Sequence, residues 1–169
     1  MADINRLIDS ARGLYSLYGE RILDDEIIVN QIEVYKEDIG RTIRMMQHAD
    51  IAATCSDCAG QGHGSCCMQD VEGWYDTMLI LINLLMGVEL PESREIAGHC
   101  LFLGNTGCKL IARYFFCVNY LCPRLMNLLG QTKAHQFMTV AGRELFSGWI
   151  VEQSLRKWLN LHTDCANGY

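Results

Sequence analysis

The sequence predicts an all-α protein, a helical bundle of roughly five or six helices that forms a single domain over residues 1–169. Three observations support this fold class. Apolar residues recur at steps of three and four over most of the chain, which is the period of an amphipathic helix. Proline occurs only 2 times, and no alternating run bounded by turn residues indicates a strand. Because 50% of the residues are hydrophobic, a chain of this length can bury a substantial core.

The first two predicted helices form an antiparallel pair with solvated outer faces. One covers residues 2–19 and ends at Gly19, a residue typical of helix ends. Its apolar stripe consists of Ile4, Leu7, Ile8, Ala11, Leu14 and Leu17. The second begins near residues 24–26, where acidic side chains suit the positive end of the helix dipole, and reaches Ala49. Its apolar stripe consists of Ile28, Ile32, Tyr35, Ile39, Ile43 and Met46.

The middle of the chain changes character at residues 51–64. This stretch contains Gly60, Gly62 and Gly64, so we expect an irregular loop that bends closely around a bound metal. A helix is then predicted over residues 70–86, which carry a broad apolar face.

The rest of the chain is predicted to be helical apart from one loop. After Pro91 a short helix is expected over residues 92–99, and an irregular loop follows at 103–107. Residues 109–129 are apolar almost all round, which indicates a buried helix that Gly130 closes. The last helix is predicted over 132–161. Its inward side chains are expected to be Phe137, Val140, Ala141, Leu145, Trp149, Ile150, Leu155 and Trp158.

The cysteines are the main candidate for chemistry. Of the 9 cysteines, all but Cys165 lie between residues 55 and 122, within a metal-binding core that we place at about residues 51–129. Thiolates are soft ligands that select zinc, copper(I) or iron–sulfur clusters, and a Cys-x-x-Cys turn presents two sulfurs to one metal. The predicted metal ligands are Cys55, Cys58, Cys66, Cys67, Cys100, Cys108, Cys117 and Cys122. Cys165 stands alone in a polar tail and is not expected to bind metal.

These cysteines form three blocks that resemble the YkgJ-like family of zinc- or iron-chelating proteins. Cys55, Cys58 and the adjacent pair Cys66-Cys67 are similar to the family's first block. Residues 100–108 are similar to the family's second block, although Leu101 replaces the family's proline. Residues 117–122 are similar to its third block. The resemblance implies a metal-binding domain, and the family includes oxidoreductases and domains fused to protein methyltransferases.

Among the metals, the sequence favours an iron–sulfur cluster of the 4Fe–4S type, with zinc as the alternative. Side chains of adjacent residues point apart, so Cys66 and Cys67 fit a polynuclear centre more easily than one mononuclear ion. For the same reason we expect one centre to join the two main cysteine blocks. Disulfides are a further alternative, but they are uncommon in the cytosol.

Other residues are predicted to support the centre. The segment 98–125 contains three basic residues, Lys109, Arg113 and Arg124, and no acid, so it offers positive charge to balance thiolates. Arg113 and Lys109 are therefore candidates for hydrogen bonding to sulfur. His63 and His99 lie beside cysteines and are candidates to support or replace a thiolate; the alternative is a polar loop residue and a helix-end residue.

Charge and motifs narrow the function classes. A net charge of −6 argues against nucleic acid as a partner. The N-terminal residues lack the apolar core of a secretory signal, and no apolar run is long enough for a bilayer, so we expect a cytoplasmic protein with no membrane contact. No nucleophile elbow, phosphate-binding loop, dinucleotide fingerprint or metalloprotease motif is present, which leaves enzyme activity open.

We therefore expect a protein that carries an iron–sulfur or iron centre for electron transfer, redox sensing or metal delivery. Its partner would be a redox protein or a metal recipient. The alternatives are a structural zinc-binding interaction module and a subunit, catalytic or not, of an oxidoreductase.

Overall fold

The computed structural model describes residues 3–61 and 65–163. These residues form a mostly helical structure, which confirms the all-α prediction, with one two-stranded antiparallel hairpin. The elements are α1 (Ile4–Leu23), α2 (Glu26–His48), α3 (Ile51–Gly60), the 3₁₀ helix η1 (Val71–Trp74), α4 (Thr77–Leu85), β1 (Leu103–Gly104), β2 (Gly107–Cys108), α5 (Phe115–Asn119) and α6 (Pro123–Thr163).

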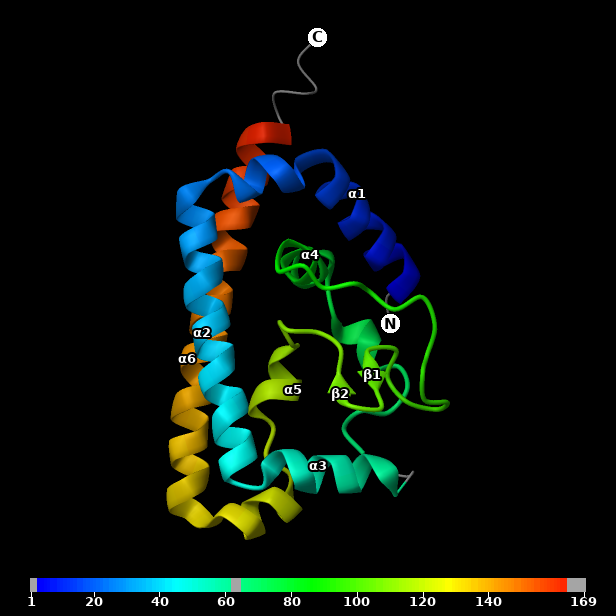
Figure 1. Ribbon diagram of the computed structural model, residues 1–169, viewed down its shortest axis with the longest axis vertical. Helices are drawn as coiled ribbons and strands as arrows, with labels where there is room; N and C mark the ends of the chain where they lie inside the picture. Colours follow the sequence, from blue (N-terminus) through cyan, green and yellow to red (C-terminus); the bar gives the residue numbers. More distant parts are fainter. Residues whose placement is uncertain (1–2, 62–64, 164–169) are drawn as a thin grey trace.

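Two long helices, α2 and α6, run side by side along the longest dimension of the molecule and form its main support (Figure 1). Helix α1 crosses one end and packs on α4. Helix α3 lies across the opposite end, below the hairpin and α5 (Figure 1). The cysteine-bearing elements therefore occupy the space beside the α2–α6 pair rather than its interior.

The N-terminal helix pair agrees with the sequence prediction. Asp25 caps α2 by accepting hydrogen bonds from the amides of Ile27 and Ile28 at 3.0 and 3.1 Å. Helix α1 continues four residues beyond Gly19, to Leu23. Two apolar residues that were expected inward are instead exposed, Leu17 at 70% and Ile43 at 41% of their surface.

Residues 51–60 were expected to form an irregular loop, and this prediction is wrong. They form helix α3, so Cys55 and Cys58 lie one turn apart on a helix. The physical reason is that Gly60 is the last residue of α3 and not an interior one. Ile51, only 1% exposed, anchors the start of α3.

Two helices expected between residues 92 and 129 are absent or much shorter. Residues 92–99 form bends and turns, and residues 109–114 are irregular, which leaves α5 with only 5 residues. Asn83 explains the second case, because its side chain bonds the amides of Ile111 and Ala112 and the carbonyl of Ala112. These backbone groups are therefore not available to a helix.

The last helical region has the break that was predicted. Gly130 has φ 63° and ψ 175°, a kink between the helical stretches on either side of it. Trp149 was expected to point inward, but it is 52% exposed and stacks on Phe146. Helix α4 begins later than predicted, because Asp76 caps it by accepting from the Leu79 amide at 2.8 Å.

The buried apolar residues form two clusters, and the cysteine region lies where they meet. The larger cluster surrounds α1, α4 and residues 100–103, and it includes or packs against Cys67, Cys100 and Cys117. The smaller cluster, built around Ile51 and Phe137, packs against Cys122. Within the described part of the chain, no helix is long and apolar enough to cross a membrane.

Candidate metal centre

The first cysteine block is held against the start of α6. Asp57, between Cys55 and Cys58 on α3, forms a 2.5 Å ion pair with Arg124. Because Arg124 follows Cys122 by two residues, the ion pair brings the thiols of Cys58 and Cys122 into the same neighbourhood. Both thiols raise the pKa of Arg124, after the larger contribution of its hydrogen bond to Asp57.

The adjacent cysteines are joined to the second block through the backbone. The amide of Cys100 donates to the carbonyl of Cys67 at 2.9 Å, and an isolated antiparallel bridge pairs Met68 with His99. The amide of Cys67 donates to the buried Ser65 hydroxyl at 3.1 Å. Residues 65–69 and 98–100 therefore run alongside one another without any metal.

The hairpin returns the chain from Cys100 to Cys108. Strand β1 pairs with β2 so that Leu103 faces Cys108, and the amide of Lys109 donates to the carbonyl of Phe102 at 2.8 Å. Gly107, the first residue of β2 after the turn, has φ 115°, a conformation that favours glycine. This geometry places Cys108 close to Cys100, although they are eight positions apart in the sequence.

Cys117 is positioned from the side of α4. The Asn83 hydrogen bonds fix residues 111–112, and Tyr114 follows them and packs against the buried ring of Tyr75 at 5.9 Å between centroids. The amide of Cys117 donates to the Tyr114 carbonyl at 2.8 Å. A side-chain hydrogen bond from Tyr75 also reaches Cys117 and opposes the rise of the Cys117 pKa.

Burial is the main influence on these thiols, and the neighbouring thiols add to it. Loss of solvation raises the pKa of Cys67 and of Cys100 to about 12, and that of Cys117 to about 11. Burial also raises the pKa of Cys55, Cys66 and Cys108. At neutral pH these six metal-free thiols are therefore protonated, and a metal that binds them must displace protons.

The electrostatic neighbours divide the eight described cysteines into two sets of four. The α3 set consists of Cys55, Cys58, Cys66 and Cys122. The hairpin set consists of Cys67, Cys100, Cys108 and Cys117. Cys66 and Cys67 belong to different sets, as expected for adjacent side chains that point apart. The sets also influence each other, because Cys55 raises the pKa of Cys67 and Cys66 raises that of Cys117.

The thiols of this region are chemically suited to bind a metal. In this conformation, however, their sulfur atoms lie farther apart than the ligands of a formed metal site. All eight described cysteines are free thiols. Among residues 3–61 and 65–163, no three histidine, cysteine or acidic side chains converge tightly enough to hold an ion in this conformation. A bound metal would have to draw sulfurs of a set together.

Two of the three basic residues in segment 98–125 already have acidic partners. Lys109 pairs with Glu95 at 2.6 Å, and Arg124 pairs with Asp57. Arg113 has no ion pair within the described residues; its guanidinium lies 3.8–3.9 Å from the sulfur of Met46. Its charge lowers the pKa of Cys55, Cys108 and Cys117, in opposition to burial. Arg113 is thus the cation that acts on both cysteine sets.

His99 makes backbone contacts with both of its ring nitrogens. Nδ1 lies 3.1 Å from the Ala97 carbonyl oxygen, and Nε2 lies 3.2 Å from the Ala59 carbonyl oxygen. His99 therefore ties the loop before Cys100 to the end of α3. His63, the other candidate histidine, and Cys165 lie outside the described residues.

Three buried polar residues support the cysteines without having been identified from the sequence pattern. Asn83 and Tyr75 fix the approach to Cys117, and Glu72 is 2% exposed and ion-paired with Arg94. Arg94 also donates to the His99 carbonyl at 3.0 Å, directly before Cys100. Of these residues, Asn83 could have been identified from the sequence, because it is a polar residue inside the most apolar run of the chain.

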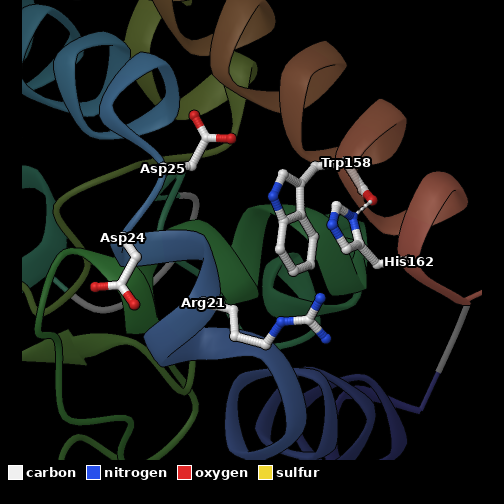
Figure 2. A pocket seen from close by; sticks show the side chains of 5 residues that line it. All are labelled: Arg21, Asp24, Asp25, Trp158 and His162. Carbon is white, nitrogen blue, oxygen red and sulfur yellow. Dashed lines mark hydrogen bonds between the residues drawn. The ribbon is translucent and has the colours of Figure 1, made fainter.

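A shallow open pocket lies at the other end of the molecule, away from the cysteines. Figure 2 shows its lining by Arg21, Asp24, Asp25, Trp158 and His162. The rings of Trp158 and His162 stack with centroids 3.8 Å apart, and Arg21 lies over the Trp158 ring at 5.4 Å. The aromatic and charged side chains already contact each other there, and no described thiol lines the pocket.

Comparison of the chain with protein-family models, with curated proteins and with solved structures gave no match. The resemblance to the YkgJ-like family therefore depends on the cysteine motifs alone.

Proposed function

We propose that this chain is a metal-binding protein that carries an iron–sulfur or iron centre through its clustered cysteines. It would act in electron transfer, redox sensing or metal delivery. The observation that carries the proposal is that eight free thiols influence one another electrostatically in two groups of four. These thiols come from α3, the loops at residues 66–67 and 100, the hairpin, α5 and the residue before α6, which are distant in the sequence.

The chemistry of the donors supports iron–sulfur ligation. Four thiolates hold a 4Fe–4S cluster, and each set offers that number. Such a cluster, when bound, supplies reversible one-electron transfer. Backbone hydrogen bonds from Phe102 to Cys100 and from Leu110 to Cys108, together with the charge of Arg113, would stabilise the negative charge of thiolates.

The partly exposed cysteines Cys55 and Cys66 support a protein partner. A donor or acceptor of electrons, or a recipient of metal, must come close to the centre. The α3 set offers such an approach, because two of its four thiols belong to exposed residues. The proposed location is the cytoplasm, where free thiols persist.

The experiment is purification under strict anaerobic conditions followed by measurement of iron, acid-labile sulfide and zinc. We expect iron and sulfide in similar amounts and a brown protein with a visible charge-transfer band. Cys165→Ser is the matched control and should retain the full metal content, whereas Cys100→Ser should lose metal. Protein that contains neither iron nor zinc after reconstitution would overturn the proposal.

A structural zinc protein is the second candidate, and the division into two sets of four favours it. Zinc prefers tetrahedral coordination by four thiolates, and two such ions would use all eight described cysteines. Zinc without sulfide, in a ratio of two ions per chain, would identify this function. The chain would then serve as an interaction module.

A further inference from the structure

The interface between α2 and α6 contains an acidic side chain that none of the cysteine chemistry uses. Glu144, in α6, is fully buried, at 0% exposure. Both of its carboxyl oxygens lack a hydrogen-bond partner within the described residues. A buried carboxylate without a partner is costly by several kcal/mol, so such a group either finds a cation or binds a proton.

The groups that face Glu144 come from α2 and from the segment before α5. From α2 these are Asp38 and the hydroxyl of Thr42, whose own donated hydrogen bond goes to the Asp38 carbonyl at 3.3 Å. From the segment before α5 it is Arg113. Tyr35 of α2, whose pKa is raised by burial and then by Glu144, also borders the site.

The other acids near this interface have partners of their own. Asp38 pairs with Arg41 at 2.6 Å. Glu152, the next acid along α6, pairs with Arg156 at 2.7 Å. Glu144 therefore differs from both in being buried and unpaired among the described residues.

Arg113 is the cation whose charge lowers the pKa of Glu144. Its guanidinium reaches the sulfur of Met46, which lies one helical turn beyond Thr42 on α2. Met sulfur is a weak acceptor, so the charge of Arg113 has no ion-pair partner within the described residues.

We propose that the Glu144 carboxyl group is a proton-binding site of the bundle interior. It is fully buried, and neither of its oxygens has a hydrogen-bond partner within the described residues, so the neutral, protonated form suits this environment better than the carboxylate. The charge of Arg113 opposes this proton binding.

The direction of the Glu144 shift agrees with this assignment. Burial raises the pKa of Glu144 above the ordinary carboxyl value, Thr42 and Arg113 lower it, and Asp38 raises it. A folded state that binds a proton more tightly than the unfolded state loses stability as the pH rises through the range between the two pKa values.

The first experiment uses the metal-free, reduced full chain and needs no assumption about metal. The denaturation midpoints of the wild type and of Glu144→Gln are measured from about pH 4 to about pH 8. This range begins near the ordinary pKa of a glutamate side chain and extends well above it. Glutamine mimics the protonated acid, so the variant should gain stability relative to the wild type as the pH rises. Glu152→Gln is the matched control on the same helix and should show no such gain. A constant difference between Glu144→Gln and the wild type would overturn the proposal.

The second experiment tests the role of Arg113 in the same metal-free protein. Arg113→Gln removes the cation, so the pH-dependent loss of stability should become larger and extend to higher pH. This change should be absent in the double variant with Glu144→Gln, and Arg113→Lys should restore the wild-type profile. An equal effect of Arg113→Gln in both backgrounds would show that Arg113 acts only by packing, and would overturn its role as the cation that opposes proton binding at Glu144.

Discussion

The backbone amide of Cys100 donates a 2.9 Å hydrogen bond to the carbonyl of Cys67. This bond continues into the Met68–His99 bridge and so joins two cysteine motifs that are distant in the sequence. The scaffold of the candidate centre is therefore partly assembled by backbone pairing. The sulfurs themselves are held more loosely, because no tight group of three donors exists among the described residues.

Replacement of Asn83 should destabilise the fold strongly. The buried side chain donates to the carbonyls of Leu79 and Ala112 and accepts from the amides of Ile111 and Ala112, at 2.8–3.0 Å. Asn83→Leu would leave three of these backbone groups, on residues 111 and 112, buried or half-buried without partners. We expect a loss of roughly 2–4 kcal/mol in the free energy of unfolding. Chemical denaturation measures it, with Asn127→Leu on the exposed surface of α6 as control.

The long helices were predictable because their apolar period persists over many residues. Asp24 to Glu26 indicated the start of α2, and Asp25 is the residue that caps it. Helix α3 was missed because glycines near its end outweighed the short helical stretch that precedes them. The region 109–114 was wrongly assigned to a helix. The sequence does not reveal that Asn83, far away in the chain, takes the backbone hydrogen bonds of residues 111 and 112.

The candidate site was predictable in its composition but not in its arrangement. The eight cysteines and Arg113 follow from the sequence, since their residue types and spacing carry the signal. The pairing of Lys109 with Glu95 depends on the fold of an irregular loop and has no local pattern. From the sequence we could predict only that the side chains of Cys66 and Cys67 point in opposite directions. The other cysteines in each one's set could be identified only from the tertiary structure.

The contact between Gly148 and Tyr35 predicts opposite effects of two glycine substitutions in α6. A Cβ at position 148 would lie 2.7 Å from Tyr35 Cζ, and the Tyr35 ring is buried and cannot move aside. Gly148→Ala should therefore cost about 1–3 kcal/mol of stability. Gly142 is exposed with no atom near its missing Cβ, so Gly142→Ala should gain up to about 1 kcal/mol. Thermal or urea denaturation of the two variants would test this; equal effects would contradict the described packing of α2 on α6.

The buried thiols predict a loss of stability at alkaline pH in the metal-free, reduced protein. Burial raises the pKa of Cys67 and Cys100 to about 12, so the folded chain keeps protons that the unfolded chain releases above pH about 8.5. Stability should fall from that pH upward, by on the order of 1 kcal/mol per buried thiol over the first pH unit. The pH slope of the unfolding free energy measures this. Cys67→Ser should reduce the slope, and an unchanged slope would contradict the burial of that thiol.

Removal of metal from the loaded protein should lower its melting temperature. The segments that carry the hairpin set are irregular loops and a two-residue hairpin, and a surface ion pair between Asp57 and Arg124 holds α3 to the start of α6. Binding energy at such a site adds to the free energy of folding. Chelation under reducing, anaerobic conditions, followed by calorimetry and metal analysis, tests this. An identical melting curve after proven loss of metal would show that the cysteines do not stabilise the fold through metal.

The two cysteine sets predict how metal is lost when single cysteines are replaced. The sequence favoured one joint centre, in which a serine at Cys58 or at Cys117 empties the same site. Cys58 influences the pKa of Cys66 in the α3 set, and Cys117 influences that of Cys67 in the hairpin set, so we now expect two centres. Each single variant should then lose about half of the metal, and the double variant Cys58→Ser with Cys117→Ser should lose the sum.

The adjacent cysteines sharpen this test, because they separate the sets at a single peptide bond. Cys66→Ser should match Cys58→Ser in metal content and spectrum, whereas Cys67→Ser should match Cys117→Ser. The packing differs in the same sense, since Cys67 is half-buried against the larger apolar cluster and Cys66 is exposed. If instead any one of the four substitutions empties the protein completely, the sulfurs must converge on one polynuclear centre. The influence of Cys66 on the pKa of Cys117 would then reflect two sulfurs bound to the same centre.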